Sequence, residues 1–195
     1  MVGEVNAPKF SGSITYMPSY FPAVVKNAGM IYYHIYTIIG HYFNDLRKAN
    51  CIPANPFPSL VGEENAKYAS EIKSTESVAL HIRRGDFVNL NWAMPPEAYA
   101  SAVKAMNEKI SNPTYFIFSD DLAYCKEHID ELGLTHNNII YVEGNQSPNN
   151  YIDMQLMAMC KHRIVNNSSF CFCAALFREY RDGLIINLTP QREIF

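Results

Sequence analysis

The 195-residue sequence has no hydrophobic run that approaches the length of a membrane span, and it has no excess of basic charge. Its first residues, MVGEVNAPKFSGS, lack the charged segment followed by an apolar segment that marks a secretory signal. Sixteen Lys and Arg against 19 Asp and Glu give a formal net charge of −3, so the whole chain carries no general attraction to nucleic acid or to an anionic membrane. We therefore expect no nucleic-acid partner.

Cysteine is also sparse. The chain has five cysteines, an odd number, and no two of them form a Cys-x-x-Cys pair. A disulfide framework is therefore not expected, and the His and Cys residues do not fall at the spacing of zinc ligands. Hydrophobic residues make up 48% of the chain and charged residues 18%, which is typical of one globular domain, or one domain with an appendage.

Two regions of the sequence differ in pattern. Residues 1–75 are rich in aromatic residues and proline, and we expect them to be largely irregular, with a strand at 30–36 that turns into a helix near Tyr42 and a short helix at 63–73. Beyond them, strands are expected at 77–82, 114–119, 138–144, 162–167 and 184–188, with intervening helices at 94–111, 120–133, 149–160 and 168–183. Short apolar strands that alternate with helices predict an α/β fold with a doubly wound parallel sheet.

The segment ESVALHIRRGDFV ends the first of these strands in a polar cluster that contains His81, Arg83, Arg84 and Asp86. Ligands of doubly wound sheets bind at the carboxyl ends of the strands. Two guanidinium groups at that position match the oxygens of a phosphate or a carboxylate. A solvated loop with an Arg–Asp salt bridge is the alternative interpretation, and the residues alone leave both open.

Other predicted strands end in polar residues as well. Asp120 and Asp121, in the segment FSDD, either cap the following helix or turn a carboxylate toward the cleft. Asp153, near the start of a later helix, also either caps it or reaches a ligand. The helix start Asn167-Ser168-Ser169-Phe170 offers N–H groups and two hydroxyls to an anion, although it also fits a plain N-cap. Because this helix start and the arginines lie at the same edge of the sheet, the sequence favours a phosphate-binding site there.

Three segments together resemble the α-1,2-fucosyltransferase family, whose members are inverting enzymes that use GDP-fucose. VALHIRRGDFV is similar to the family's H-x-R-R-G-D-Y segment, with Phe87 in place of Tyr, and YFIFSDD is similar to its strand and S-D-D segment. YIDMQLMAMCKHRIVNNSSFCFCAALF is similar to its D-M-x-L-M-x-x-C-x-H-x-I-x-x-N-S-[ST]-F-S-W-W-G-A-W-L block. The resemblance spans roughly Ile31 to Asn187, because YYHIYTIIGHYFNDLRK weakly matches a further family stretch.

The resemblance implies a fold of two Rossmann-like domains that face each other across a cleft. This chain would cover the C-terminal, donor-binding domain with residues 76–195, preceded at 1–75 by a remnant of the N-terminal domain and a linker. The resemblance assigns Arg83 and Arg84 to the GDP pyrophosphate. It places His81 and Asp153 near the guanine of GDP-fucose. It places four further binding residues along the phosphates: Asn167, Ser168, Ser169 and Phe170.

The implied reaction moves L-fucose from GDP-fucose to a galactose 2-hydroxyl of a glycan, with inversion at C1. Arg83 and Arg84 would stabilise the charge that grows on the departing diphosphate, so neither a metal nor a cofactor is expected. Asp86 is the candidate base for the acceptor hydroxyl, and orienting the arginines is its alternative role. The expected partners are GDP-fucose and a galactose-terminated glycan. The expected location is the bacterial cytoplasm, with peripheral association with the inner membrane left open.

Two departures from the family pattern bear on activity. The family's opening G-G-L-G-N-Q-x-F-Q turn has no counterpart here, so the chain resembles a member that lacks most of its N-terminal domain. The family's S-W-W-G-A-W-L segment reads CFCAALF, which keeps apolar or small residues at each position. These departures bear on catalysis more than on nucleotide binding. The resemblance predicts an enzyme, a galactoside α-1,2-fucosyltransferase. The alternatives are a non-catalytic GDP-sugar-binding fragment and a degenerate phosphate-binding α/β module.

Overall fold

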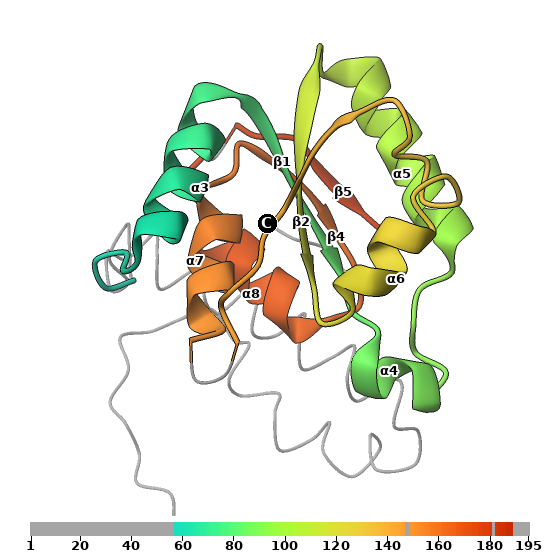
Figure 1. Cartoon of the computed structure of the whole chain (residues 1–195). Helices are drawn as coiled ribbons and strands as arrows, with labels where there is room; N and C mark the ends of the chain where they lie inside the picture. The colour runs from blue at the N-terminus through green and yellow to red at the C-terminus, as the bar shows by residue number, and fades with distance from the viewer. Residues whose placement is uncertain (1–56, 147–148, 181, 189–195) are drawn as a thin grey trace, which may run out of the picture. The chain divides into compact units, whose positions relative to one another are not determined.

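A computed structural model of the chain describes residues 57–146, 149–180 and 182–188 (Figure 1). All of them fall within one compact unit, Ala54–Pro190. The segment at 32–48 that weakly matches the family lies outside the described residues, as do the strand expected at 30–36 and the helix expected near Tyr42. The domain boundary expected between residues 75 and 76 stays a prediction.

Five parallel strands form a single sheet in the order β3-β2-β1-β4-β5. Their bounds are β1 (Glu76–Ile82), β2 (Pro113–Ser119), β3 (Asn138–Tyr141), β4 (His162–Val165) and β5 (Ile185–Asn187). The chain builds outward from β1 to β3 and then crosses to the other side of β1, where it adds β4 and β5. This order confirms the predicted doubly wound parallel sheet, and it creates a topological switch point between β1 and β4.

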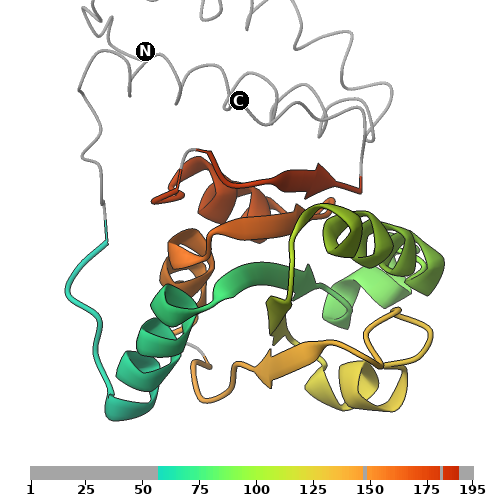
Figure 2. The same cartoon turned by 90° about the horizontal axis from the view of Figure 1, so that it is seen from above.

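Helices cover both faces of this sheet, as Figures 1 and 2 show. One face carries α5 (Pro96–Lys109) and α6 (Leu122–Glu127), and the other carries α3 (Glu63–Ser74), α7 (Tyr151–Met159) and α8 (Ser169–Leu176). Helix α3 precedes the expected domain boundary, yet it packs against β1 and α7. The layered α/β arrangement is Rossmann-like, as expected.

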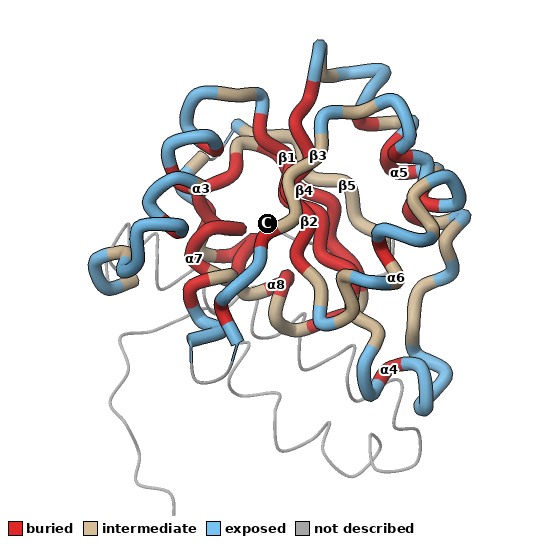
Figure 3. Tube along the Cα trace, in the orientation of Figure 1, coloured by how far each residue is buried: buried red, intermediate tan, exposed pale blue. Residues whose placement is uncertain are grey.

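The core lies on both sides of β1 and β2, which are almost wholly buried (Figure 3). Side chains alternate between the faces of a strand, so Val78, Leu80 and Ile82 share one face and pack in the core cluster with residues of α5. By the same alternation, His81 points toward the opposite face, where α7 and α8 lie. The end of β1 therefore places His81 beneath the start of α8.

Helix α8 ends at Leu176 instead of continuing to 183, and β3 ends at Tyr141 instead of 144. Two further elements differ from the sequence expectation. The helix expected at 120–133 ends at Glu127, and the chain then turns so that Leu132 and Leu134 are both fully buried. Residues two positions apart point to different sides of a helix, so a continuous helix would not bury both leucines in one core. Gly133, with φ +74°, supports this turn. The second difference is the additional short helix α4 (Gly85–Asn89), which is too short for the sequence periodicity to reveal.

Candidate functional site

The carboxyl ends of β1 and β4 meet at the switch point, and Asn166 joins the two chain segments there. Its side chain is buried, with 1% of the residue exposed. The Asn166 Nδ2 donates to the carbonyl of His81 at 2.8 Å and to the Tyr99 hydroxyl at 3.0 Å. Its Oδ1 accepts from the N–H of Ser168 at 2.9 Å. One amide therefore fixes the start of α8 against the end of β1.

Sequence reasoning missed Asn166 and selected its neighbour Asn167 instead. The Asn167 side chain donates to the carbonyl of Trp92 at 2.7 Å, in the loop that follows α4. The adjacent Asn-Asn pair before the Ser-Ser helix start was the available signal. Sequence alone did not indicate which of the two side chains turns inward to bridge the strands.

His81 lies under the start of α8. The residue is buried, with 5% of its surface exposed. Its ring centroid lies 5.7 Å from that of Phe170, and the two ring planes are tilted by 34°. Burial lowers the pKa of His81 to about 4, against a smaller raising effect of Asp120, so the imidazole is neutral at pH 7. Within the described part of the chain its Nδ1 has no hydrogen-bond partner. A neutral, buried imidazole of this kind can donate or accept one directed hydrogen bond.

Arg83 leaves the end of β1 and is held between two carboxylates. Its Nη2 lies 2.8 Å from Asp86 Oδ1, and its Nη1 lies 3.0 Å from Asp120 Oδ2. The Arg83 side chain is 37% exposed and that of Asp86 is 59% exposed, whereas that of Asp120 is 26% exposed. The salt bridge considered from the sequence is therefore present, and it leaves the Arg83 guanidinium open to solvent on one side.

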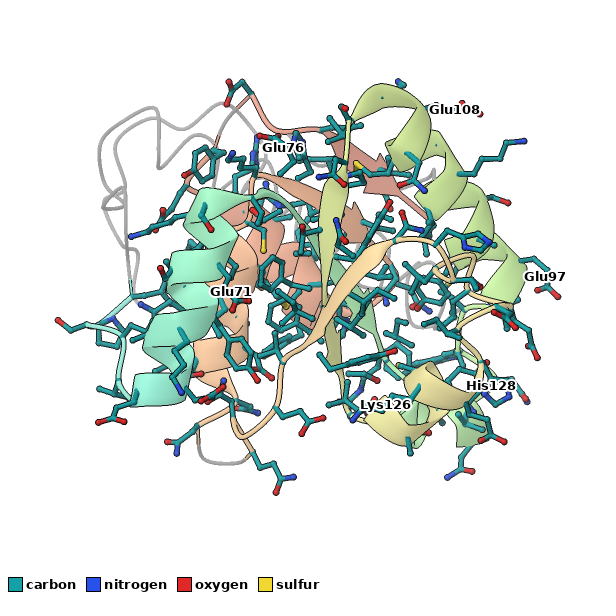
Figure 4. The ribbon with its side chains drawn as sticks, turned by 45° about the horizontal axis from the view of Figure 1, so that its top comes forward. Glu71, Glu76, Glu97, Glu108, Lys126 and His128 are labelled. Atoms are coloured by element: carbon teal, nitrogen blue, oxygen red, sulfur yellow. The ribbon has the colours of Figure 1, made fainter. Side chains whose placement is uncertain are left out.

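Arg84 turns the other way, toward α6. Its Nε lies 3.2 Å from Asp121 Oδ2, and its guanidinium carbon lies 3.3 Å from the centre of the Tyr124 ring. Tyr124 in turn stacks on His128, which Figure 4 labels at the end of α6, away from Glu76 at the start of β1. A guanidinium that is stacked on a ring and paired with a carboxylate in this way anchors its loop. Arg83 is consequently the better placed of the two arginines for a ligand.

The two acidic residues of FSDD serve these loops. Asp121 is the N-cap of α6, and its Oδ1 accepts from the Tyr124 N–H at 3.1 Å. Asp120 accepts from the backbone N–H of Arg84 at 2.8 Å in addition to pairing with Arg83. A Cβ at Gly85 would lie 2.4 Å from Asp120 Oδ2, so glycine at this position leaves room for the carboxylate. Asp120 thus fixes both the backbone and the guanidinium at the end of β1.

Ser168 caps α8, as the sequence allowed. Its hydroxyl accepts from the Phe170 N–H at 3.3 Å, and its own residue is 4% exposed. Ser169 opens the helix, so the positive end of the α8 dipole faces the switch point. Cys171, which stands where the family pattern has serine, lies with its Sγ 3.0 Å from Asn166 Oδ1. The thiol therefore supports the same bridging amide.

Asp153 belongs to a separate polar cluster between α7 and α3. Its Oδ1 accepts from Asn145 Nδ2 at 2.8 Å, and Asn145 exchanges two hydrogen bonds with Asn65 of α3. Burial raises the pKa of Asp153 to about 6 despite the Asn145 hydrogen bond. Among the described residues, no contact is recorded between Asp153 and the β1 or β4 loops. Its approach to a guanine stays a prediction.

Three further observations concern the described residues. No group of three His, Cys, Asp or Glu side chains in them could hold a metal ion, and their four cysteines are free thiols. No helix in this part is both long and apolar enough to cross a bilayer. A groove of about 600 Å³ lies between the segment 57–60, α3 and α7, and contains no residue of the switch-point site.

The fold and the site define an α/β domain that holds an arginine loop and a serine-capped helix at the switch point of a parallel sheet. Comparison with known families gives a match of residues 28–194 to glycosyl transferase family 11. This match covers most of the chain, so the protein belongs to glycosyl transferase family 11. The resemblance to the α-1,2-fucosyltransferases is thereby confirmed at the level of the family.

Three relatives illustrate the range of similarity. An alpha-1,2-colitosyltransferase of Escherichia coli is 33% identical over 136 residues, which cover 66% of this chain and 46% of that protein. The O-antigen biosynthesis glycosyltransferase WbnK of Escherichia coli is 23% identical over 121 residues, covering 59% of this chain and 39% of that protein. The galactoside 2-alpha-L-fucosyltransferase SEC1 of Bos taurus is 26% identical over 104 residues, covering 50% and 27%. The match thus spans less than half the length of each relative.

Proposed function

We propose that this chain acts as a glycosyltransferase that moves L-fucose from GDP-fucose to a galactose 2-hydroxyl of a glycan, with inversion at C1. Membership of family 11 supports glycosyl transfer in general. The single observation that carries the donor site is the bridge made by Asn166, which joins the carbonyl of His81 to the N–H of Ser168. It brings the Arg83 loop and the positive end of α8 to one edge of the sheet.

This edge suits a diphosphate. Arg83 offers a partly exposed guanidinium, and α8, which follows the neighbouring strand β4, offers the positive end of its dipole. The Arg83–Asp86 pair is an exposed contact between residues three positions apart, and such pairs contribute about 0–1 kcal/mol. A diphosphate that displaces Asp86 from Arg83 therefore meets little resistance, whereas Asp120 continues to hold the guanidinium in place.

The same groups serve the chemical step. When the bond between C1 of fucose and the phosphate oxygen breaks, negative charge develops on the diphosphate and positive charge on the sugar ring. Arg83 and the α8 dipole stabilise the leaving diphosphate, which is the role that a metal fills in many other transferases. Asp86, released from Arg83, is the candidate base that accepts the proton of the attacking acceptor hydroxyl. Attack from the face opposite the leaving group inverts C1.

Calorimetric titration with GDP tests the donor site. We expect saturable binding, and we expect Arg83→Ala to weaken it by roughly 2 kcal/mol, the low end for truncating one partner of a charge pair, because Arg83 is partly exposed. Lys126→Ala is the matched control, because it removes one positive charge away from the site. Lys126 lies on α6 and pairs with Glu143 at 2.7 Å. Equal GDP affinity for Arg83→Ala and the native chain would contradict the assignment.

A transfer assay then separates the candidate activities. Lactose is the acceptor, and the donors are GDP-fucose and a colitosyl donor, because one relative is named an alpha-1,2-colitosyltransferase. Transfer from GDP-fucose supports the proposed reaction. Preferential transfer from the colitosyl donor would favour a second candidate function, colitosyl transfer. Binding of GDP without turnover of either donor would identify the chain as a binding module.

A further inference from the structure

The chain between α4 and α5 presents a small apolar surface to solvent. Val88 is 44% exposed, Leu90 is 49% exposed and Trp92 is 46% exposed. Figure 3 shows α4 and the turn after it mainly in the colour of exposed residues. Trp92 is also the only tryptophan of the chain. Exposing so large an apolar ring requires a reason, because its burial would be favourable.

Trp92 is held rigidly in this exposed position. Its backbone N–H donates to the carbonyl of Phe87 at 2.8 Å, and its ring meets the buried Phe87 ring edge to face, with centroids 5.7 Å apart and planes at 86°. The turn that positions it contains Asn91 at φ 55°, a left-handed conformation that a non-glycine residue adopts at a cost. The carbonyl of Trp92 accepts from the Asn167 side chain at 2.7 Å.

These contacts place the indole beside the proposed donor site. Asn167 directly precedes Ser168, the cap of α8, so the hydrogen bond from Asn167 ties the Trp92 loop to the start of α8. On the other side, the Arg83 guanidinium carbon lies 5.7 Å from the centre of the Phe87 ring. Two ring contacts therefore lead from Arg83 to Trp92. The candidate base Asp86 belongs to the same short helix as Phe87.

We propose that Trp92 is the platform on which a pyranose ring of the acceptor glycan stacks. The inference rests on the proposed glycosyl transfer, and it adds a binding site for the acceptor. One face of a pyranose presents C–H groups, which pack on the flat face of an indole, while its hydroxyls seek polar groups at the rim. Polar groups are available on the same short segment, because Asp86, Asn89 and Asn91 are all exposed on α4 and the turn that leads to Trp92.

The size of this surface favours a sugar over a protein. Stable protein interfaces bury about 800 Å² on each partner, and they need a broad apolar centre. The Trp92 surface consists of three apolar side chains interspersed with polar ones. Such mixing suits a ligand whose own apolar and polar groups alternate over a few ångström.

The single tryptophan allows a direct test in the native chain. Lactose is titrated while Trp92 emission is recorded, with GDP absent and then present at saturation. We expect a saturable change in emission and protection of the indole from iodide quenching. In the transfer assay, Trp92→Ala should raise the KM for lactose about tenfold and leave the Kd for GDP unchanged. Tyr151→Ala, at an aromatic side chain 38% exposed on α7, is the matched control.

The outcomes separate this inference from the proposed function. Normal GDP binding with no lactose response of Trp92, or with an unchanged KM in Trp92→Ala, would overturn the platform and leave the donor site standing. A lactose response without GDP binding would support the platform and refute the donor site. If the native chain shows no lactose response and Trp92→Ala changes the oligomeric state, the surface is a protein interface instead. Trp92→Phe, which retains a smaller ring, serves if the alanine variant does not fold.

Discussion

Replacing Gly85 with alanine should damage the site through one carboxylate. The new Cβ would lie 2.4 Å from Asp120 Oδ2, which is closer than any real contact, so the Asp120 side chain has to turn away. Gly85 has no left-handed backbone conformation that alanine would strain. The entire cost should therefore arise from the two contacts that Asp120 makes, to the Arg84 N–H at 2.8 Å and to Arg83 Nη1 at 3.0 Å.

The size of the effect follows from these two contacts. A hydrogen bond to a charged group contributes about 1.5–3 kcal/mol, and a partly exposed ion pair contributes about 0–1 kcal/mol. Asp120→Ala should therefore reduce the free energy of unfolding by about 2–3 kcal/mol. Gly85→Ala should cost nearly as much, less about 0.5–1 kcal/mol that alanine gains over glycine in the unfolded chain and in a helix.

A double-mutant cycle measured by urea unfolding tests this reasoning. In the Asp120→Ala background the obstructing carboxylate is absent, so Gly85→Ala should be neutral or slightly stabilising. The expected coupling energy is about 2 kcal/mol, within the range for residues in direct contact. Equal costs of Gly85→Ala in the two backgrounds would show that the glycine is needed for another reason, and would refute the role given to Asp120.

Four further predictions concern single residues. Asn166→Ala should cost about 3 kcal/mol in urea unfolding, because it leaves the His81 carbonyl, the Tyr99 hydroxyl and the Ser168 N–H without their partner, and a cost like that of Asn167→Ala would contradict the bridge. Ser168→Ala should cost about 1 kcal/mol of stability and Ser168→Thr much less, since threonine keeps the capping oxygen; equal losses would argue against the cap. The pKa of Asp153 is raised to about 6, so between about pH 4 and 6 the folded chain binds more protons than the unfolded chain, and this group's stabilising contribution falls as the pH rises. Asp153→Asn should remove that fall from the free energy of unfolding measured across this range. An identical pH profile in the variant would contradict the assignment. Arg163→Met should be neutral or stabilising by thermal melting, because Arg163 is 2% exposed, its Nε and Nη1 are unpartnered in the described chain, and only its Nη2 donates, to the Cys160 carbonyl at 2.6 Å; a large loss would show that this one hydrogen bond is necessary.

The regular part of the fold was predictable because its elements have strong local patterns. Apolar strands such as 77–82 bury both faces, and helix boundaries such as the Ser168 cap have their own residue preferences. Helix α4 and the early end of α6 were not predicted. The first is too short to show periodicity, and the second depends on where Leu132 and Leu134 find space in a core that only the folded chain defines.

The candidate site divides in the same way. Sheet topology was enough to predict that the ends of β1 and β4 would lie together, and with them Arg83 and Ser168. The direction of each side chain was not predictable, because it depends on distant partners. Arg84 packs on Tyr124, forty positions along the chain, and Asp120 reaches back to the loop after β1. Long-range contacts of this kind leave no local trace in the sequence.

The bridging amide has a chemical vulnerability. Slow hydrolysis of an asparagine side chain replaces its amino group with an oxygen, and the aspartate that results accepts hydrogen bonds but donates none while it is ionised. At position 166 that exchange would set a negative oxygen against the backbone oxygen of His81, where a donor now sits. An aged protein of nearly unchanged mass would then hold the ends of its two central strands apart, because repulsion would replace the attraction that joins them.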